Sequence, residues 1–150
     1  MTTERDAVVR ACSACGAQNR VPGRRLAETG RCGRCKAALP PIAEPVDASA
    51  ELFAAVVAEA KVPVLVDFWA AWCGPCRAAA PGVKSVAESM AGKAIVLKVD
   101  TDRHPDLAQR YKVMGIPNFV VLKGGRVVSQ QAGLVGASEL QRRLEAAESA

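Results

Sequence analysis

Residues 67–76 read DFWAAWCGPC, and this stretch decides the fold of the chain. A near-continuous apolar run, residues 62–69, leads into it and is broken only by Pro63 and Asp67. Such a run of β-branched and aromatic residues is typical of a strand that is buried on both faces of a sheet. The sequence after Cys73 is typical of a helix, so the two cysteines fall where a buried strand gives way to a helix.

A helix N-terminus favours the ionised form of a cysteine. Free backbone N–H groups and the positive end of the helix dipole bring a cysteine pKa from about 8.5 into a range of about 3.5 to 7.5. We therefore expect Cys73 to be the attacking nucleophile. Cys76, one turn further and less exposed, is expected to resolve the mixed disulfide. A metal pair or an inert disulfide is the alternative, but a single CxxC pair does not complete a four-ligand zinc site.

Resolution requires that Cys76 lose a proton, and Asp67 is the neighbouring acid, in the middle of an apolar strand. Burial raises the pKa of a carboxyl, which would let Asp67 exchange a proton near neutral pH. A solvated edge residue or a structural acid with satisfied partners is the alternative. Lys98, in the next expected strand, is either the charge partner of Asp67 or a side chain that extends to the surface.

Outward from this site, the sequence predicts alternating helices and strands. Gly92 suits the left-handed cap after the second helix, Gly124 and Gly125 suit a hairpin turn, and Ser138 with Gln141 forms a capping box for a last helix. Strands separated by helices pair in parallel, so we expect an α/β fold with a mixed central sheet flanked by helices. The expected helices are residues 48–60, 73–90 and 105–111, and the expected strands are residues 62–69, 94–100, 118–122 and 126–130.

Residues 41–150 resemble the thioredoxin family over their whole length. The resemblance is carried by residues 67–76 and extends to Pro81, to Gly115-Ile116-Pro117, to the Gly124-Gly125 turn and to Gly133. It implies the thioredoxin fold, with a cis peptide bond before Pro117 that faces the cysteines and with the Ile116 backbone pairing with the substrate chain. The residues that it places at an apolar docking surface for protein disulfides are Trp72, Gly74, Pro75, Ile116, Pro117 and Gly133, whereas Trp69 is expected in the core.

The resemblance also implies the reaction: reduction of protein disulfides by the Cys73 and Cys76 dithiol, which a thioredoxin reductase then restores with NADPH. No organic cofactor takes part. Three residues depart from the family pattern: Ala71 stands where proline is frequent, Asn118 where threonine is usual, and Gly82 lies within a helix, where it costs about 1 kcal/mol against alanine. A disulfide isomerase or oxidase on the same fold is one alternative, and a zinc-ribbon binding module is another.

Four further cysteines, Cys12, Cys15, Cys32 and Cys35, form two CxxC pairs separated by sixteen residues. This is the spacing of a Cys₄ zinc site, with two local disulfides or four free thiols as the alternative. The segment holds too little apolar material for a core, so we expect zinc to supply most of its folding free energy. It resembles the N-terminal zinc-binding extension of the second class of bacterial thioredoxins. Prolines 40, 41 and 45 suit a semi-rigid linker, so we place a zinc ribbon at residues 1–40 and a thioredoxin domain at residues 41–150.

The net charge of +5 lies in residues 1–40, which hold eight Lys or Arg against three acids, whereas residues 41–150 hold twelve of each. Zinc-bound thiolates would offset part of this charge, and the segment has no aromatic residue for base stacking, so we expect no nucleic-acid partner. No apolar run could span a bilayer and residues 1–6 are too polar for a signal peptide, so we expect a cytoplasmic monomer without membrane contact. His104, the single histidine, is expected on the surface.

Overall fold

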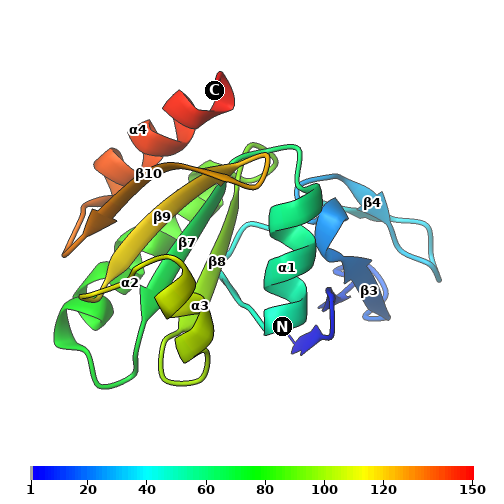
Figure 1. Ribbon diagram of the computed structural model, residues 1–150. Coiled ribbons are helices and arrows are strands. Elements are labelled where there is room, and N and C mark those ends of the chain that lie inside the picture. Colours follow the sequence, from blue (N-terminus) through cyan, green and yellow to red (C-terminus); the bar gives the residue numbers. More distant parts are fainter. Residues whose placement is uncertain (1) are drawn as a thin grey trace.

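A computed structural model describes residues 2–150 and has the expected mixed sheet at its centre (Figure 1). Three strands are parallel, and the closing hairpin adds two antiparallel strands on one side. In spatial order the five strands are β10 (Arg126–Ala132), β9 (Asn118–Lys123), β7 (Val64–Trp69), β8 (Ile95–Asp100) and β6 (Val46–Asp47). The strand β7, which leads to the cysteines, therefore lies in the middle of the sheet, as its apolar sequence predicts.

Helices cover both faces of this sheet (Figure 1). On one face, α1 (Ala50–Glu59) and α3 (Pro105–Arg110) pack against Val66, Phe68 and their neighbours. On the other, α2 (Gly74–Ser89) and α4 (Ala137–Glu148) pack against Leu65 and Phe119. The layered α/β prediction is confirmed. Within residues 2–150, no helix is both long enough and apolar enough to cross a membrane.

The ends of the elements follow local sequence signals, with one exception. Ser49 caps α1 by accepting a hydrogen bond from the Leu52 N–H at 3.1 Å, and the hairpin turn has φ of 60° at Gly124 and 80° at Gly125, as a two-residue turn requires. The predicted capping box of the last helix is wrong. The helix α4 begins at Ala137 with Gly136 as its cap, two residues before the predicted cap, so Ser138 lies inside the first turn.

The N-terminal part contains short strands where the sequence analysis expects only turns. A three-stranded antiparallel sheet is followed by a 3₁₀ turn and a two-stranded sheet. The cysteine-bearing turns lie between strands of each sheet. These elements are β1 (Thr2–Glu4), β2 (Ala7–Ala11), β3 (Gln18–Pro22), η1 (Gly23–Arg25), β4 (Gly30–Arg31) and β5 (Ala38–Leu39).

This N-terminal part shares the main core, which the sequence analysis does not foresee. Val8, Leu26 and Ile42 are buried in the same apolar cluster as α1 and the sheet, and the Ile42 N–H donates to the Leu26 carbonyl at 2.9 Å. Gly23 lies so close to α1 that a Cβ there would meet Val56 Cγ2 at 3.0 Å. Metal binding is thus not the sole source of stability in residues 1–40. The domain boundary near residue 41 stays a prediction.

Candidate active site and metal centre

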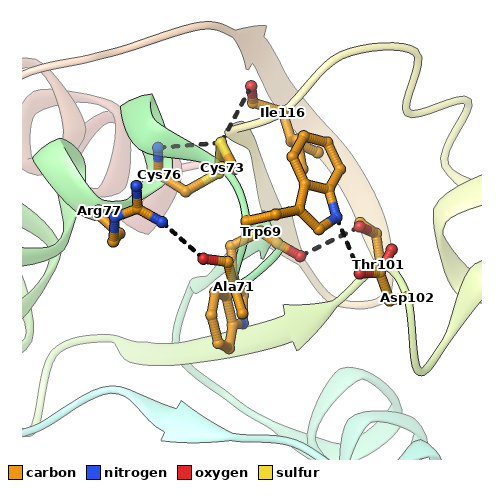
Figure 2. Close-up of a disulfide and its surroundings, with 9 residues drawn as sticks. Trp69, Ala71, Cys73, Cys76, Arg77, Thr101, Asp102 and Ile116 are labelled. Atoms are coloured by element: carbon orange, nitrogen blue, oxygen red, sulfur yellow. Dashed lines mark hydrogen bonds between the residues drawn. A yellow bond between two sulfur atoms is a disulfide. The ribbon is translucent and has the colours of Figure 1, made fainter.

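Cys73 and Cys76 occupy the first turn of α2, as predicted. Cys73 is the N-cap residue, and its Sγ accepts a hydrogen bond from the Cys76 N–H at 3.1 Å (Figure 2). Pro75 fits the first turn because the N–H that it lacks has no acceptor within the helix there. The two cysteines are joined by a disulfide, with their Cα atoms 5.3 Å apart. The N–H donor and the helix dipole both favour negative charge on Cys73 once the disulfide is reduced.

The expected difference in exposure between the two cysteines is absent. Cys73 is 3 % exposed and Cys76 is 5 % exposed, so the prediction that Cys76 is the less accessible one is wrong for this oxidised form. The reason is that Ala70 and Ile116 pack against both sulfur-bearing residues. The two cysteines differ in their position on α2: Cys73 is the N-cap residue, and its Sγ accepts a hydrogen bond that the Cys76 N–H donates.

A loop opposite α2 brings a backbone carbonyl to the redox pair. The Ile116–Pro117 peptide bond is cis, as the resemblance implies, and the Ile116 carbonyl oxygen lies 3.7 Å from Cys73 Sγ (Figure 2). The Pro117 carbonyl accepts a hydrogen bond from the Gly133 N–H at 2.8 Å, and Gly133 has φ of 92°, which glycine adopts without strain. The loop therefore holds the Ile116 carbonyl beside Cys73 Sγ.

A shallow cavity of about 430 Å³ adjoins Cys73, and most of its lining is apolar. Trp72 is 68 % exposed at its rim, and its Nε1 donates to Asp102 Oδ2 at 2.9 Å, which fixes the indole plane. Met114, 95 % exposed, lies on the opposite loop. Sequence reasoning finds Trp72 but misses Met114 and Asp102. For Met114 the available signal is its place directly before the Gly115-Ile116-Pro117 motif.

Asp67 is buried in β7, 2 % exposed, and strand alternation puts its side chain on the face that α2 covers. Burial raises the pKa of Asp67 to about 6, with the nearby Lys98 charge acting in the opposite direction. Among residues 2–150, Asp67 Oδ1 has no hydrogen-bond partner. The predicted direction of the pKa shift is confirmed, and a buried carboxyl with a raised pKa lies beneath the redox helix.

Lys98 lies directly across from Asp67 in the β7–β8 register but forms no ion pair with it within the described part of the chain. Its Nζ instead stands 4.3 Å from the centroid of the Trp69 ring, a cation–π contact. The half-buried Trp69 contacts the cysteine cluster rather than the deep core. Lys98 thus acts on Asp67 through its charge alone.

The residues that depart from the family pattern have identifiable surroundings. The Ala71 carbonyl accepts a hydrogen bond from Arg77 Nη1 at 2.7 Å, so an arginine of α2 ties down the turn where proline is frequent (Figure 2). Asn118 is buried and hydrogen-bonded to Gln130. A Cβ at Gly82 would lie 3.6 Å from the Ala137 backbone N, an ordinary contact distance. His104, expected on the surface, is half-buried at the start of α3.

The four N-terminal cysteines converge as predicted. Their Sγ atoms all lie within 4.8 Å of one another, with 3.6 Å between Cys12 and Cys35 and 3.7 Å between Cys15 and Cys32. A zinc ion with Zn–S bonds of about 2.3 Å needs sulfur atoms about 3.8 Å apart in a tetrahedron. The donor set and its spacing therefore fit zinc.

Each CxxC pair of this cluster lies in the same kind of turn. Gly16 N–H donates to the Cys12 carbonyl at 2.8 Å, and Lys36 N–H donates to the Cys32 carbonyl at 3.0 Å. Both turns close through a left-handed residue, Gly16 with φ of 77° and Lys36 with φ of 67°. Two such turns face each other and bring the sulfur atoms together, because β2–β3 and β4–β5 hold them at their ends.

The surroundings of the four sulfur atoms act unequally on their pKa values. The pKa of Cys12 is lowered, whereas that of Cys15 is raised to about 12, because its hydrogen bond with Ala17 lowers it less than burial and hydrogen bonds with the other cysteines raise it. The backbone N–H of Cys35, then the side chain of Asn19 and the backbone N–H of Arg34, lower the pKa of Cys32 to about 5. Asn19 Nδ2 is 3.5 Å from Cys32 Sγ, and Asn19 Oδ1 accepts from the Gly33 N–H at 2.9 Å. Sequence reasoning misses Asn19, which bridges the two turns from β3.

Comparisons with known proteins agree with both sites. A family model described as Thioredoxin matches residues 44–146, and one described as Thioredoxin 2, N-terminal, matches residues 11–37. The chain is 37 % identical over 134 residues to thioredoxin C-3 of Corynebacterium nephridii, covering 89 % of this chain and 91 % of that protein. It is 46 % identical over 89 residues to thioredoxin 1 of Nostoc sp. (strain PCC 7120), covering 59 % and 83 %.

Solved structures are similar over the larger part of the chain. A mutant thioredoxin from Halobacterium salinarum NRC-1 has a TM-score of 0.62 at 36 % identity, over 70 % of this chain and 91 % of the other. Chloroplastic thioredoxin z has a TM-score of 0.65 at 29 % identity, over 71 % and 96 %.

Proposed function

The chain belongs to the thioredoxin family, and from that premise we propose that it reduces disulfides of other proteins through Cys73 and Cys76, with an NADPH-dependent thioredoxin reductase restoring the dithiol. The observation that carries this proposal is the disulfide at the N-terminus of α2, beside an apolar cavity and an open backbone carbonyl. Thiol–disulfide oxidoreduction is the chemistry of the family. What we propose for this chain is the direction, which is reduction of the substrate disulfide, and the electron donor, which is NADPH through the reductase.

In the reduced protein, the Cys73 thiolate attacks one sulfur of a substrate disulfide. A mixed disulfide forms, and the other substrate sulfur leaves as a thiolate that takes up a proton. Cys76 then loses its proton and attacks Cys73 Sγ, which releases the second substrate thiol and forms the Cys73–Cys76 disulfide. Two electrons pass from the dithiol to the substrate, and NADPH returns them through the reductase.

We assign Asp67 to the proton step at Cys76. A carboxyl with a pKa of about 6 is largely ionised at pH 7 and can accept a proton from a thiol on the helix that covers it. Lys98 tunes this step by its charge, since it lowers the pKa against the effect of burial.

The surface beside Cys73 is the docking site in this proposal. Trp72, Gly74 and Pro75 offer an apolar face on one side of the sulfur, and Ile116 and Pro117 offer backbone on the other. An extended substrate segment can pair with the Ile116 carbonyl while its disulfide meets Cys73. Gly133, whose N–H holds the Pro117 carbonyl, supports this loop.

For the N-terminal cluster we propose a structural zinc ion bound by Cys12, Cys15, Cys32 and Cys35. Zinc would cross-link the two turns and neutralise two of the four negative charges on the thiolates. A reducing compartment keeps both these thiolates and the redox dithiol reduced, which supports a cytoplasmic location.

Turnover of insulin, followed as NADPH oxidation in the presence of a thioredoxin reductase, tests the proposed function. We expect wild-type protein to reduce insulin disulfides and Cys73→Ser to show no turnover above background. Cys76→Ser should accumulate a mixed disulfide with insulin chains, visible by non-reducing electrophoresis. Equal turnover by wild type and Cys73→Ser would refute the assignment.

A further inference from the structure

The loop of residues 112–117, between α3 and β9, lies beside Cys73. Val113, Met114 and Ile116 line the cavity beside the redox pair, and the Ile116 carbonyl oxygen lies 3.7 Å from Cys73 Sγ. The left-handed Lys112, with φ of 56°, turns the chain out of α3 into this loop. Whatever fixes the two ends of the loop therefore fixes how a substrate chain meets the sulfur.

One side-chain amide holds both ends. Gln130 Nε2, on β10, donates to the Tyr111 carbonyl at 2.9 Å and to Asn118 Oδ1 at 3.1 Å. Tyr111 immediately precedes the loop and Asn118 immediately follows it. The two N–H groups of a single NH₂ thus donate to two anchors that lie seven residues apart along the chain.

Both anchors are themselves rigid. Asn118 is 4 % exposed and pairs in register with Phe68 of β7, in the middle of the sheet. The Tyr111 ring packs against Phe53 and Phe68, with ring centroids 5.8 Å and 5.9 Å apart. The β9–β10 register puts Gln130 on the diagonal from Asn118, within reach of its side chain. Because packing holds both anchors in place, the hydrogen bonds that Gln130 makes to them restrict the loop between them.

We propose that Gln130 and Asn118 form an amide clamp that positions residues 112–117 for protein substrates and so sets substrate selectivity. Asn118 suits this role because its acceptor oxygen lies one bond further from the backbone than the hydroxyl of the threonine that is usual here in thioredoxins. The proposal rests on the proposed function, since it assigns the loop to substrate docking. Gln130 and Asn118 are positioning residues and touch no reacting atom.

The clamp predicts a difference between large and small disulfides. A protein substrate that pairs with the loop backbone binds more weakly if the loop must be ordered on binding. Loss of the clamp should therefore weaken the binding of protein substrates. A small aromatic disulfide, 5,5′-dithiobis(2-nitrobenzoate), needs only the sulfur atom. Loss of the clamp should raise KM for insulin and leave kcat and the rate with the small disulfide unchanged.

The experiment uses full-length, zinc-loaded protein and the variant Gln130→Met, which keeps the length of the side chain and removes both donors. Gln130 is exposed, so the variant should fold. The matched control is Gln131→Met on the same strand, whose amide donates to the Ala132 carbonyl at 3.0 Å and accepts from Arg143. For Gln130→Met we expect KM for insulin to rise about five- to tenfold, as the loss of hydrogen bonds of this kind predicts.

Hydrogen exchange provides a second readout that does not depend on turnover. In Gln130→Met the amides of residues 113–118 should exchange about tenfold faster than in Gln131→Met, with the rest of the chain unchanged. Asn118→Thr, which releases one end of the loop, should give a smaller increase in KM, and adding it to Gln130→Met should have little further effect.

Equal KM values and equal loop exchange for Gln130→Met and Gln131→Met would overturn the clamp. So would a parallel loss of rate with insulin and with the small disulfide, which would indicate damage to the sulfur chemistry instead. Absence of insulin reduction by the wild type would refute the proposed function, and the exchange measurement would still decide whether the clamp holds the loop.

Discussion

The two cysteine sites share the CxxC spacing and differ in the backbone that follows it. After Cys76 the chain continues as a helix, and the Arg77 N–H donates to the Cys73 carbonyl at 3.2 Å. After Cys15 and Cys35 a left-handed residue closes the turn. The helix places two sulfur atoms beside each other at its positive end, where they form a disulfide. The two closed turns place four sulfur atoms around one point, which suits a metal ion.

The electrostatic surroundings of the two cysteine sites also differ. In the four-cysteine site, backbone and Asn19 donors lower the pKa of Cys32 to about 5. In the redox site, a buried carboxyl with a raised pKa lies beneath the helix, so protons can move on and off. The spacing of a CxxC motif therefore does not decide its chemistry, and the residue that follows the second cysteine carries more information.

The largest expected effect is that of removing zinc. Cys32→Ser, or treatment with a chelator, should disorder the two cysteine turns, residues 12–17 and 32–37, since metal binding contributes about 10–16 kcal/mol to the folding of zinc-finger peptides. The check is metal content together with amide chemical-shift dispersion for these residues. Cys73→Ser, the matched change at the redox pair, should keep one zinc per chain. Retention of the dispersion without metal would contradict the assignment of a structural zinc site.

The second-largest expected effect is the destabilisation of the whole chain by a mutation in its N-terminal part. Leu26, in the N-terminal part, is fully buried in the main core, so Leu26→Ala should lower the free energy of unfolding of the whole chain by about 2–5 kcal/mol. Denaturant unfolding of zinc-loaded protein measures it. Arg24→Ala, an exposed change in η1, should alter stability by no more than about 0.5 kcal/mol. A loss confined to residues 11–37 would show that the two regions fold independently.

Asp67 gives a pH-dependent effect. The pKa of Asp67 is about 6 in the folded protein against an ordinary value of 3.8. Ionisation of the buried carboxyl therefore costs no stability below about pH 4, and above about pH 6 it lowers the free energy of unfolding by about 3 kcal/mol. Asp67→Asn should therefore match the wild type near pH 4 and exceed its free energy of unfolding by up to about 3 kcal/mol at pH 8. Unfolding curves at several pH values test this. Glu145→Gln, at an exposed acid, should give a flat difference, and the same flat result for Asp67→Asn would refute the raised pKa.

The smallest effect is confined to the redox helix. Gly82→Ala should raise the free energy of unfolding by about 0.5–1 kcal/mol, because the new Cβ fits at ordinary contact distance and alanine favours a helix. Ala78→Gly, at an exposed position of the same helix, should lower it by a similar amount. Thermal unfolding at constant zinc content measures both. Destabilisation by Gly82→Ala would mean that the new methyl group clashes with Ala137 of α4.

Sequence patterns predict most of the larger domain because its signals are local. Apolar runs, the Gly124-Gly125 turn and the CGPC motif place α1, α2, α3 and the strands β7 to β10 within two residues of their observed ends, whereas for α4 they predict only a start near Ser138. Cysteine spacing likewise predicts the metal cluster. The cis bond before Pro117 follows from the resemblance alone.

The features that escape sequence reasoning depend on contacts between distant segments. Val8 and Leu26 look like isolated apolar residues in a basic segment, and only their packing against α1 shows that they belong to the core. Asn19 and Gln130 are single polar residues whose partners lie on other elements. The two-residue strand β6 is too short for a periodic pattern, and parallel pairing with β8 alone defines it.

The packing of η1 on α1 has a practical consequence for shortened versions of the protein. A chain that starts at residue 44, where the thioredoxin match begins, would retain the redox site but lose the residues that cover Leu52 and Val56. An apolar stripe would then face water, and such stripes drive self-association. A truncated form intended for crystallisation or assay should carry polar replacements on that side of α1, or be expected to aggregate.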